Sequence, residues 1–515
     1  MAAAETMDFS MLRQIARHDL IHLLESTPGV KDLAVEPSLM KALDRIASMS
    51  LLLQHGVGKI YHFVGGQALP WGAETDRRVY LVKPTLANAK HITDHVRADP
   101  ERRFTVVFVP RRLLTCDMVF EQHGVFGQLD VHEFNWSLLQ LESDVLSLEL
   151  PEFAHSSLVD RTDSWTHTVA RSLWHLQSLF GPIPTVYGVG NVAKDVHSLT
   201  ERMFSELGEP RATAEQPISH LFLLDRSLDF ASALLTGLTY ESMLNDMFGI
   251  NCGKISFGDE VESKLKQQDK QPNKTRLLSC ADPVYASVRD SHMTAVFPFL
   301  SAKAKMLQAS YDKGQNLNEV KDMKHFVSNE LKGLKEQHKS LELHIGASEA
   351  VLRKSTGMSQ RLSLEHACIE GGGSKEMLAF MEDWMCQQLN EWQLLMLICL
   401  YSLSQNGLSA KDYQSLRAQY LQAYGHKYFL AWHSLKKVGL LIERPAGSSI
   451  VPNVSVSLPI PNRPQDIDPS RPPMFPYVAK RLNLLPKTEG GVDLKSPTEM
   501  NYVFSGAPRL AGRWL

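Results

Sequence analysis

Apolar positions in the first half of the chain follow two spacings, and each spacing predicts a different kind of element. Short runs rich in β-branched and aromatic residues predict strands, at 33–35, 60–63, 79–82, 104–109, 185–187 and 220–224. Apolar residues that recur every three or four positions predict helices between them, around 38–54, 85–97, 113–122, 163–180 and 191–206. This alternation is typical of parallel sheets with crossover helices, so we expect an α/β fold in this half.

A further helix is predicted before the first of these strands. Its apolar positions recur at helical spacing between residues 9 and 23, Asp8 or Ser10 can cap its start, and Pro28 follows its end. One face of this helix should therefore be buried. Leu24 lies in its last turns, and we expect it to be critical for folding because proline there would remove a backbone donor and clash with the preceding turn.

The pattern changes after about residue 250, where long helical windows begin that continue to about 440. We therefore predict an α/β domain at 1–150, the first part of a second α/β domain at 151–250 and a helical domain at 251–444. Nine prolines fall among the 32 residues 445–476, a composition that excludes helix interiors and central strands. We interpret this last segment as an exposed linker.

Charge and cysteine content narrow the class of protein. Lysine and arginine number 54 against 57 aspartates and glutamates, and the net charge of −3 gives no general attraction to nucleic acid or anionic lipid. The six cysteines lack the close spacing of a zinc site or a redox pair, which is typical of buried, reduced thiols.

The N-terminus does not have the regions of a secretory signal, and the longest apolar run, 394–403, is too short for a membrane span. We expect a cytoplasmic protein with no nucleic acid partner that reaches membranes through other proteins.

One short motif has the form of a dinucleotide-binding turn. Residues 188–193 read GVGNVA, a GxGxxA pattern between a predicted strand and a predicted helix. The carboxylate that binds a ribose belongs roughly 20 residues further on. Asp225, however, lies 32 residues beyond Ala193. Two interpretations stay open: a nucleotide-dependent oxidoreductase that uses the turn at Gly188, or glycines that only allow tight strand-to-helix packing.

Other patterns give an enzyme little support. His18 and His22 are four residues apart, a spacing that could ligate a metal, but nothing indicates a third ligand, and Asp19 stands where an HExxH helix has glutamate. The sequence contains no nucleophile elbow, no phosphate-binding loop and no recognisable Cys–His signature. We expect no catalytic residues, no cofactor and no metal.

The helical half carries a local excess of positive charge. Residues 301–361 contain eleven lysines and arginines against seven acidic residues, for a net charge of +4. Several of the lysines are spaced so that they can share helix faces: Lys321, Lys324, Lys332, Lys335 and Lys339. A solvated helix surface is one interpretation. The other is a basic surface that receives an acidic, amphipathic partner helix.

Two neighbouring segments carry a family resemblance. LFLLDRSLD at 221–229 and LTYESMLND at 238–246 resemble the signature of the SM (Sec-1/Munc-18) family of SNARE-binding proteins. Stretches at 43–47, 109–112 and 141–149 resemble its vacuolar protein sorting branch. The resemblance implies structural roles for the signature residues, which are Asp225, Arg226, Asp229, Tyr240 and Asp246.

The resemblance implies an arch of two α/β parallel-sheet domains and a helical third domain that contacts SNARE helices. That third domain contains the lysines at 321–339. The implied function is to promote membrane docking and fusion in endosome-to-lysosome and recycling transport, without enzymatic activity. The implied partners are SNARE proteins and a VIPAR-type (Vps-sixteen-like) subunit, with a Rab GTPase as a further candidate, at late endosomes, lysosomes and recycling endosomes. A structural tethering subunit without SNARE contact is an alternative.

The C-terminal part departs from the family pattern. Family members complete the second domain with a strand and helix after the region that corresponds to 502–506, whereas this chain turns to other residues and stops at 515. We therefore expect 477–515 to be an incomplete return to the second domain. Such a return would leave an unpaired sheet edge and uncovered apolar surface.

Overall fold

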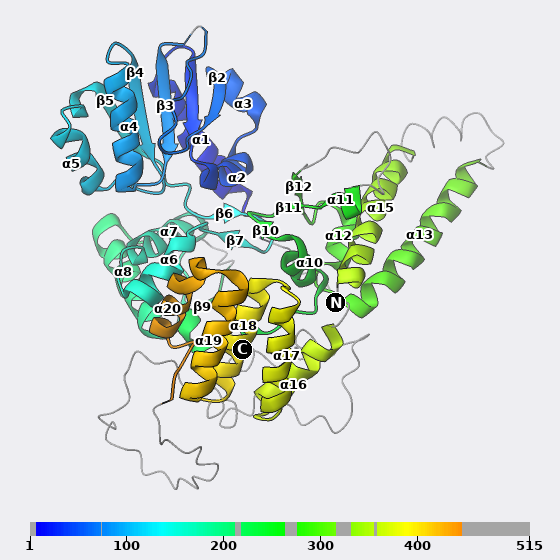
Figure 1. Cartoon of the computed structure of the whole chain (residues 1–515). Coiled ribbons are helices and arrows are strands. Elements are labelled where there is room, and N and C mark those ends of the chain that lie inside the picture. The colour runs from blue at the N-terminus through cyan, green and yellow to red at the C-terminus, as the bar shows by residue number, and fades with distance from the viewer. Residues whose placement is uncertain are drawn as a thin grey trace.

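The computed structural model describes residues 7–73, 75–211, 218–262, 275–315, 331–354 and 358–444. Figure 1 shows an arch in which an N-terminal α/β unit and a pair of long helices form two separate arms above a body that is mostly helical. The predicted fold class, parallel-sheet α/β plus all-α, is confirmed. Within these described ranges, no helix is both long enough and apolar enough to cross a membrane.

The N-terminal arm is built on a five-stranded sheet in the order β2-β1-β3-β4-β5. Its strands are β1 (Lys31–Val35), β2 (Val57–His62), β3 (Arg77–Val82), β4 (Arg103–Phe108) and β5 (Leu129–Glu133). All neighbouring strands are parallel, as the alternation of strands and helices predicted. The sequence pattern missed β5, because this edge strand alternates with charged and polar residues and only its first residue is buried.

Helices cover both faces of this sheet: α1 (Ser10–Ser26), α2 (Pro37–Ile46), α3 (Met49–Gln54), α4 (Leu86–Ala98) and α5 (Leu114–Gln122). Side chains of α1, α2 and α3 pack with Leu33 on one face, and those of α4 and α5 pack with Ala34 on the other, because successive strand residues point to opposite faces. Leu24 of α1 is 2 % exposed in the first of these cores. Its carbonyl accepts a hydrogen bond from Lys31 Nζ at 2.7 Å.

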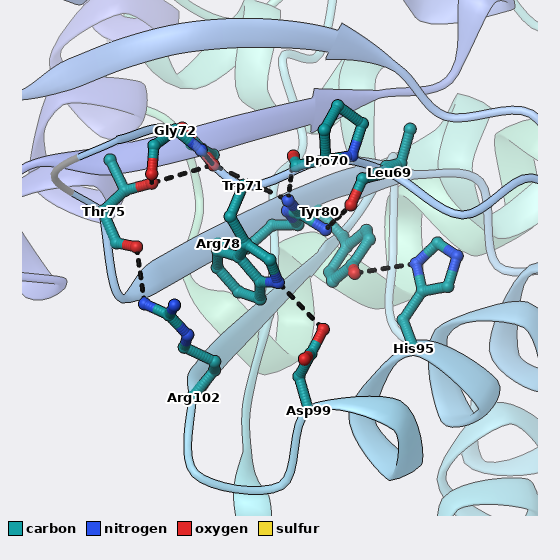
Figure 2. Close-up of polar contacts among 11 residues, drawn as sticks. Leu69, Pro70, Trp71, Gly72, Thr75, Arg78, Tyr80, His95, Asp99 and Arg102 are labelled. Carbon is teal, nitrogen blue, oxygen red and sulfur yellow. Dashed lines mark hydrogen bonds and ion pairs between the residues drawn. The ribbon is translucent and has the colours of Figure 1, made fainter.

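The connection from β2 to β3 contains no helix in its described residues, 63–73 and 75–76. Arg78 of β3 donates hydrogen bonds to the carbonyls of Leu69 at 3.3 Å and Pro70 at 2.6 Å, and its guanidinium lies 4.0 Å from the Trp71 ring centroid (Figure 2). Asp32 of β1 lies 3.6 Å from the guanidinium, and both side chains are buried. In a helix, backbone N–H groups would donate hydrogen bonds to such carbonyls. In this irregular connection the Arg78 guanidinium is the donor instead.

A second α/β unit follows the first arm. The connection consists of β6 (Leu139–Gln140), β7 (Leu146–Ser147), α6 (Pro151–His155) and η2 (Ser156–Asp160). The unit contains α7 (Thr166–Phe180), β8 (Thr185–Val189), α8 (Asn191–Leu207) and β9 (His220–Leu224), close to the predicted ranges. In the described part of the chain, β8 and β9 form a two-stranded parallel sheet on which Tyr187, Phe222 and Leu224 are exposed. The predicted linker 445–476 and return segment 477–515 lie outside the described residues.

The remainder is mainly helical. The first group is η3 (Arg226–Leu228), α9 (Ala231–Leu234), α10 (Tyr240–Phe248), α11 (Asp259–Glu262), α12 (Pro283–Val288), α13 (Met293–Gln315) and α15 (Leu331–Lys354). The second group is α16 (Met358–Ile369), α17 (Ser374–Cys386), α18 (Glu391–Ser404), α19 (Ala410–Tyr424), η6 (His426–Tyr428) and α20 (Phe429–Val438). Side chains of α10, α11, α12, α13 and α15 share one hydrophobic core. Side chains of α9 and of the helices from α16 to α20 share a separate core.

Three short strands lie at 250–277, where the sequence pattern predicted helices. β10 (Ile250–Asn251), β11 (Lys254–Ser256) and β12 (Thr275–Leu277) form an antiparallel sheet. Cys252 and Gly253 make the turn between the first two strands, with φ of 54° and 70°. Strands of two or three residues are too short to produce an alternating pattern, so spacing could not reveal them.

Charged side chains join the first arm to the rest of the molecule. Lys254 of β11 forms an ion pair with Asp44 of α2 at 2.5 Å. Arg289, directly after α12, donates a hydrogen bond to Asp144 at 2.6 Å. These contacts lie on the path between the two arms of the arch, so they help to set the distance between the arms.

All six cysteines are free thiols. Four are buried, as the sequence predicted, whereas Cys280 is partly exposed and Cys386 is exposed. The expectation of buried thiols is therefore wrong for these two. Cys386 is the last residue of α17, where the helix reaches solvent.

Candidate functional site

The second arm consists of the long helices α13 and α15 (Figure 1). A cleft of about 330 Å³ lies between these two helices. It is lined by Ala304, Leu307 and Gln308 from α13 and by His338, Leu341, Glu342, Ile345, Gly346 and Glu349 from α15. The α15 residues recur every three or four positions, so they form one stripe along the helix. An apolar floor with polar edges fits the apolar face of an amphipathic helix.

Apolar contacts position the two helices. Leu307 and Leu341 are 6 and 4 % exposed and belong to the core that α10, α12, α13 and α15 share. Tyr311 of α13 meets His338 of α15 edge to face, with ring centroids 6.3 Å apart. These contacts close the floor of the cleft and leave its polar residues at the surface.

The predicted basic residues fall into three groups. Lys335 and Lys339 are exposed on α15, each three residues before a side chain that lines the cleft. Lys332 belongs to α15, but its side chain is not among those that the structure describes. Lys321 and Lys324 lie outside the described residues. A role of these lysines in SNARE binding stays a prediction.

Sequence reasoning missed the acidic side chains of the cleft. Glu342 and Glu349 line it, with Gln308 opposite on α13. The net charge of +4 over 301–361 concealed them, because lysines outnumber them there. The signal that could have found them is spacing, since residues three, four and seven apart share a helix face. The cleft is therefore of mixed charge rather than uniformly basic.

A buried polar network fixes α15 beneath the cleft. His344 of α15 is 1 % exposed, and its Nδ1 lies 2.9 Å from the hydroxyl of Tyr240 on α10. Its Nε2 lies 3.3 Å from Asp282, which also accepts a hydrogen bond from the Ser340 hydroxyl. The Tyr285 ring stacks on His344 with centroids 5.8 Å apart. The signature residue Tyr240 thus contacts the helix that carries the cleft, 104 residues further along the chain.

Two ionisable groups are shifted by this network. Burial alone raises the pKa of Asp282, but hydrogen bonds from His344, Ser340 and the Val284 N–H outweigh burial and hold that pKa at about 2. Burial raises the pKa of Tyr240, and the charge of Asp282 raises it further. At neutral pH, Asp282 is therefore an ionised acceptor and the Tyr240 hydroxyl keeps its proton.

The glycine turn at 188–193 holds a carboxylate where a dinucleotide-binding turn would hold phosphate. Asp225 accepts hydrogen bonds from the N–H groups of Ala193 at 2.7 Å and Val192 at 3.1 Å, at the start of α8. A Cβ on Gly190 would lie 2.1 Å from Asp225, so this contact requires glycine. Because the carboxylate already occupies the positive end of α8, it disfavours a second anion there. This geometry favours strand-to-helix packing over nucleotide binding.

The remaining signature residues do not gather into one site. Asp229 accepts hydrogen bonds from the Ser232 N–H at 2.9 Å and the Ser232 hydroxyl at 2.6 Å, at the start of α9. Arg226 of η3 and Asp246 of α10 are exposed. Among the residues that the structure describes, no group of three or more His, Cys, Asp or Glu side chains is placed to hold a metal ion.

Comparisons with known proteins agree with this architecture. The model of the Sec1 family matches residues 31–508. The chain is 39 % identical to vacuolar protein sorting-associated protein 33B of Mus musculus, over 98 % of this chain and 82 % of that protein. It is 28 % identical to vacuolar protein sorting-associated protein 33A of Rattus norvegicus, over the same shares. The stretches at 149–153, 330–335 and 343–347 predict the likeness to 33B, which the first of these comparisons confirms.

Solved structures of this fold include two complexes. The SM protein Vps45 in complex with the Qa SNARE Tlg2 has a TM-score of 0.53 and 16 % identity, over 83 % of this chain and 76 % of that chain. The Unc18–syntaxin 1 complex from Monosiga brevicollis has a TM-score of 0.52 and 18 % identity, over 87 and 82 %. At such identities the likeness establishes the fold alone. The family match along most of the sequence and the identity to 33B together show that the chain belongs to the Sec1, or SM, family of vesicle-trafficking proteins.

Proposed function

We propose that this chain binds SNARE helices in the cleft between α13 and α15 and so promotes membrane docking and fusion. The observation that carries the proposal is the cleft itself, an apolar floor bounded by polar side chains along two long helices. Such a surface can accept the apolar stripe of an amphipathic helix. The SNARE complexes of Vps45 and Unc18, which share this fold, support the choice of ligand.

The mechanism requires no chemistry. A helix held in the cleft has already lost the rotational and conformational freedom that it must lose when it joins a SNARE bundle. If the arch holds two helices in register, assembly becomes an intramolecular step with a higher effective concentration. The buried network under α15 supports this mechanism because it holds α15 in place. If α15 moved, the cleft could not hold a partner helix in register.

A second surface suits a partner subunit of the VIPAR type. Apolar side chains around Tyr428 are exposed at the starts of α18 and α20, namely Trp392 at 54 %, Phe429 at 47 % and Leu430 at 74 %. The Trp392 and Tyr428 rings are 5.4 Å apart, so the side chains form one patch. Arg417 lies 5.0 Å from the Phe429 ring centroid, which favours acidic residues on the partner. Through such a subunit or a Rab GTPase, the chain would reach late endosomes, lysosomes and recycling endosomes.

The test of SNARE binding is co-precipitation of a preassembled endosomal SNARE bundle with the full chain and with single variants. Gln308→Trp fills the cleft from its α13 wall, so we expect loss of the bundle. Ala309→Trp adds the same ring to the next residue, which is exposed and does not line the cleft, and should bind normally. If both variants bind the bundle equally, the SNARE contact lies outside this cleft.

The same assay separates the two alternatives. If neither the native chain nor the Ala309→Trp control binds any bundle, a structural tethering subunit without SNARE contact becomes the better interpretation. For the oxidoreductase alternative, calorimetric titration with NAD, FAD and ATP is decisive. We expect no binding, since Asp225 lies at the start of α8 within hydrogen-bond distance of its N–H groups. Micromolar affinity for any of these nucleotides would contradict that expectation.

A further inference from the structure

The two hydrophobic cores of the helical half meet at a joint, which we define as residues 235–239 together with α16. Residues 235–239 lead from α9, which packs in the core of α16 to α20, to α10, which packs in the core of α13 and α15. Helix α16 contacts both cores. Met358 and Leu362 pack against the core of α13 and α15, whereas Leu364 and Cys368 belong to the other core. The joint therefore connects the second arm to the body.

A buried carboxylate on α16 holds the two parts of the joint together. Glu365 is 2 % exposed, and it accepts hydrogen bonds from the Thr236 N–H at 3.1 Å and from the Thr236 hydroxyl at 2.7 Å. Arg361, one turn earlier on α16, is 4 % exposed and donates a further hydrogen bond to Glu365 at 2.8 Å. These donors offset the cost of burying the carboxylate charge. Because the site is shielded from water, each bond is stronger than it would be at the surface.

The residues that follow Thr236 are tightly packed on α10. A Cβ on Gly237 would lie 2.3 Å from the Ser242 hydroxyl oxygen, so this part of the joint lies directly against the first turn of α10. The Thr239 side chain accepts a hydrogen bond from the Ser242 N–H and caps the same helix. We therefore expect Thr236 and α10 to move together.

Helix α10 and the joint are in turn bound to both helices of the second arm. The Tyr240 hydroxyl lies 2.9 Å from Nδ1 of His344 on α15. The Leu238 carbonyl accepts a hydrogen bond at 2.9 Å from the N–H of Met293, the first residue of α13. A continuous line of contacts thus runs from Glu365 on α16 to α13 and α15.

We infer that Glu365 is a positioning residue, which holds Thr236 and so fixes the angle between the second arm and the body. Without these hydrogen bonds the apolar contacts of the joint remain, but apolar contacts have no direction and permit several angles. A partner that contacts arm and body together would then find the required angle in a fraction of the molecules, and its apparent affinity falls by that fraction. The joint itself is independent of the proposed function, whereas its effect on SNARE binding rests on that function.

Thr236 offers a matched pair of variants for a test in the full chain. Thr236→Val keeps the branched shape but loses the hydroxyl donor, whereas Thr236→Ser keeps the donor but loses a methyl group. Spin labels on non-natural amino acids at the exposed positions Ala302 of α13 and Lys411 of α19 report the distance between arm and body by double electron–electron resonance. We expect Thr236→Val to widen the distance distribution about twofold, because a bond to a charged acceptor is lost. Thr236→Ser should keep the native width.

A second pair of labels, at the exposed positions Lys375 of α17 and Lys411 of α19, is the control. Both positions lie in the body, so their distance distribution should be the same in the native chain and in both variants. An unchanged distance between arm and body in Thr236→Val overturns the inference. Equal widening in Thr236→Val and Thr236→Ser also overturns it, because packing of the side chain rather than its hydrogen bond would then hold the joint.

The effect on function is measured by titrating the same two variants with the SNARE bundle. Thr236→Val should bind about tenfold more weakly than the native chain, and Thr236→Ser should bind normally. Native affinity in Thr236→Val, despite a widened distance distribution, would overturn the role of Glu365 in positioning the arm for SNAREs. If the native chain binds no bundle, the proposed function fails, but the distance measurements still decide whether Glu365 holds the joint.

Discussion

The buried side chain of Arg78 holds the irregular connection between β2 and β3 in place. It lies under an irregular connection, pairs with Asp32 at 3.6 Å and donates to two backbone carbonyls, while Trp71 covers it. Arg102 lies near the same indole ring, at 4.9 Å from its centroid, and Asp99 accepts a hydrogen bond from its N–H (Figure 2). A buried ion pair contributes little net stability by itself, but removing one partner leaves a buried charge alone.

Arg78→Met should therefore destabilise the first arm strongly. It leaves the Asp32 carboxylate buried near an apolar side chain and two carbonyls without their donor, and we expect the free energy of unfolding to fall by about 3–5 kcal/mol. Denaturant unfolding of the purified chain measures this. The matched control is Arg77→Met, whose partner Asp76 is largely exposed, with an expected change of about 0.5 kcal/mol or less. Equal shifts for both variants would contradict the account.

Asp282 predicts a pH dependence. Its folded-state pKa of about 2 lies below its ordinary value of 3.8, so its ionised form stabilises the fold above about pH 4. That contribution is lost as the pH falls from about 4 to about 2. The stability difference between the native chain and Asp282→Asn should thus be largest at neutral pH and shrink toward pH 2. Asp130→Asn, at an exposed position of β5, should show no such trend. A constant difference for Asp282→Asn would contradict the hydrogen-bond explanation.

At the scale of elements, α1 contributes one continuous buried stripe to the core of the first arm. Its buried positions Leu12, Ala16, Leu20 and Leu24 form the stripe that the sequence predicted. The Leu24 carbonyl is bound by the buried Lys31, whose pKa is lowered by burial. Lys31 Nζ also donates a hydrogen bond to the His55 carbonyl at 3.1 Å, so one buried side chain of β1 holds both the end of α1 and the residue after α3.

Leu24→Pro should unfold this end of the arm. Proline removes a helix hydrogen bond, clashes with the preceding turn and empties a core position, at a cost of about 3 kcal/mol or more. We expect low soluble yield in cells and a lower melting temperature. Leu24→Met keeps the helix and nearly the volume and should cost less than about 1.5 kcal/mol. A normal melting temperature for the proline variant would show that α1 does not pack as described.

At the scale of the whole molecule, polar contacts join the segments that lie between the two arms. Arg289 donates hydrogen bonds to Asp144 on one side and Asp290 on the other, and it also contacts the Cys280 sulfur. Burial by itself would lower the pKa of Arg289, but the bonds to the two carboxylates outweigh it and raise that pKa. The residue therefore keeps its charge at any physiological pH and links α12 to the β6–β7 connection.

Arg289→Met should loosen this link without unfolding either arm. We expect small-angle X-ray scattering to report a larger radius of gyration and a broader distance distribution, because the arms then sample more relative positions. SNARE bundle binding should weaken in parallel if both arms contact the bundle. Lys305→Met, exposed on α13, is the control and should change neither measurement. An unchanged scattering curve for Arg289→Met would show that other contacts set the distance between the arms.

Sequence spacing predicted the elements that bury a regular stripe. The strands β1 to β4, the helices between them, and the α7-β8-α8-β9 unit lie close to their expected ranges. Sequence spacing failed where an element is too short or too polar to show a repeated spacing of apolar residues. The examples are β5 and the sheet of β10, β11 and β12. For the site, spacing identified Lys335 and Lys339 on one helix but not Glu342 and Glu349, because a net charge averages over all faces of a helix.

The sequence by itself determined the fold class and the family, because periodicity and the stretches at 221–229 and 238–246 are local properties of the chain. Only the tertiary structure decided what individual residues do. Asp225 caps α8 from 32 residues away, and Tyr240 reaches His344 across 104 residues. Neither pairing leaves a trace in spacing, because each depends on the path of the chain between the partners. The acidic lining of the cleft also depends on tertiary structure, because Glu342 and Glu349 line it on the face of α15 that packs beside α13.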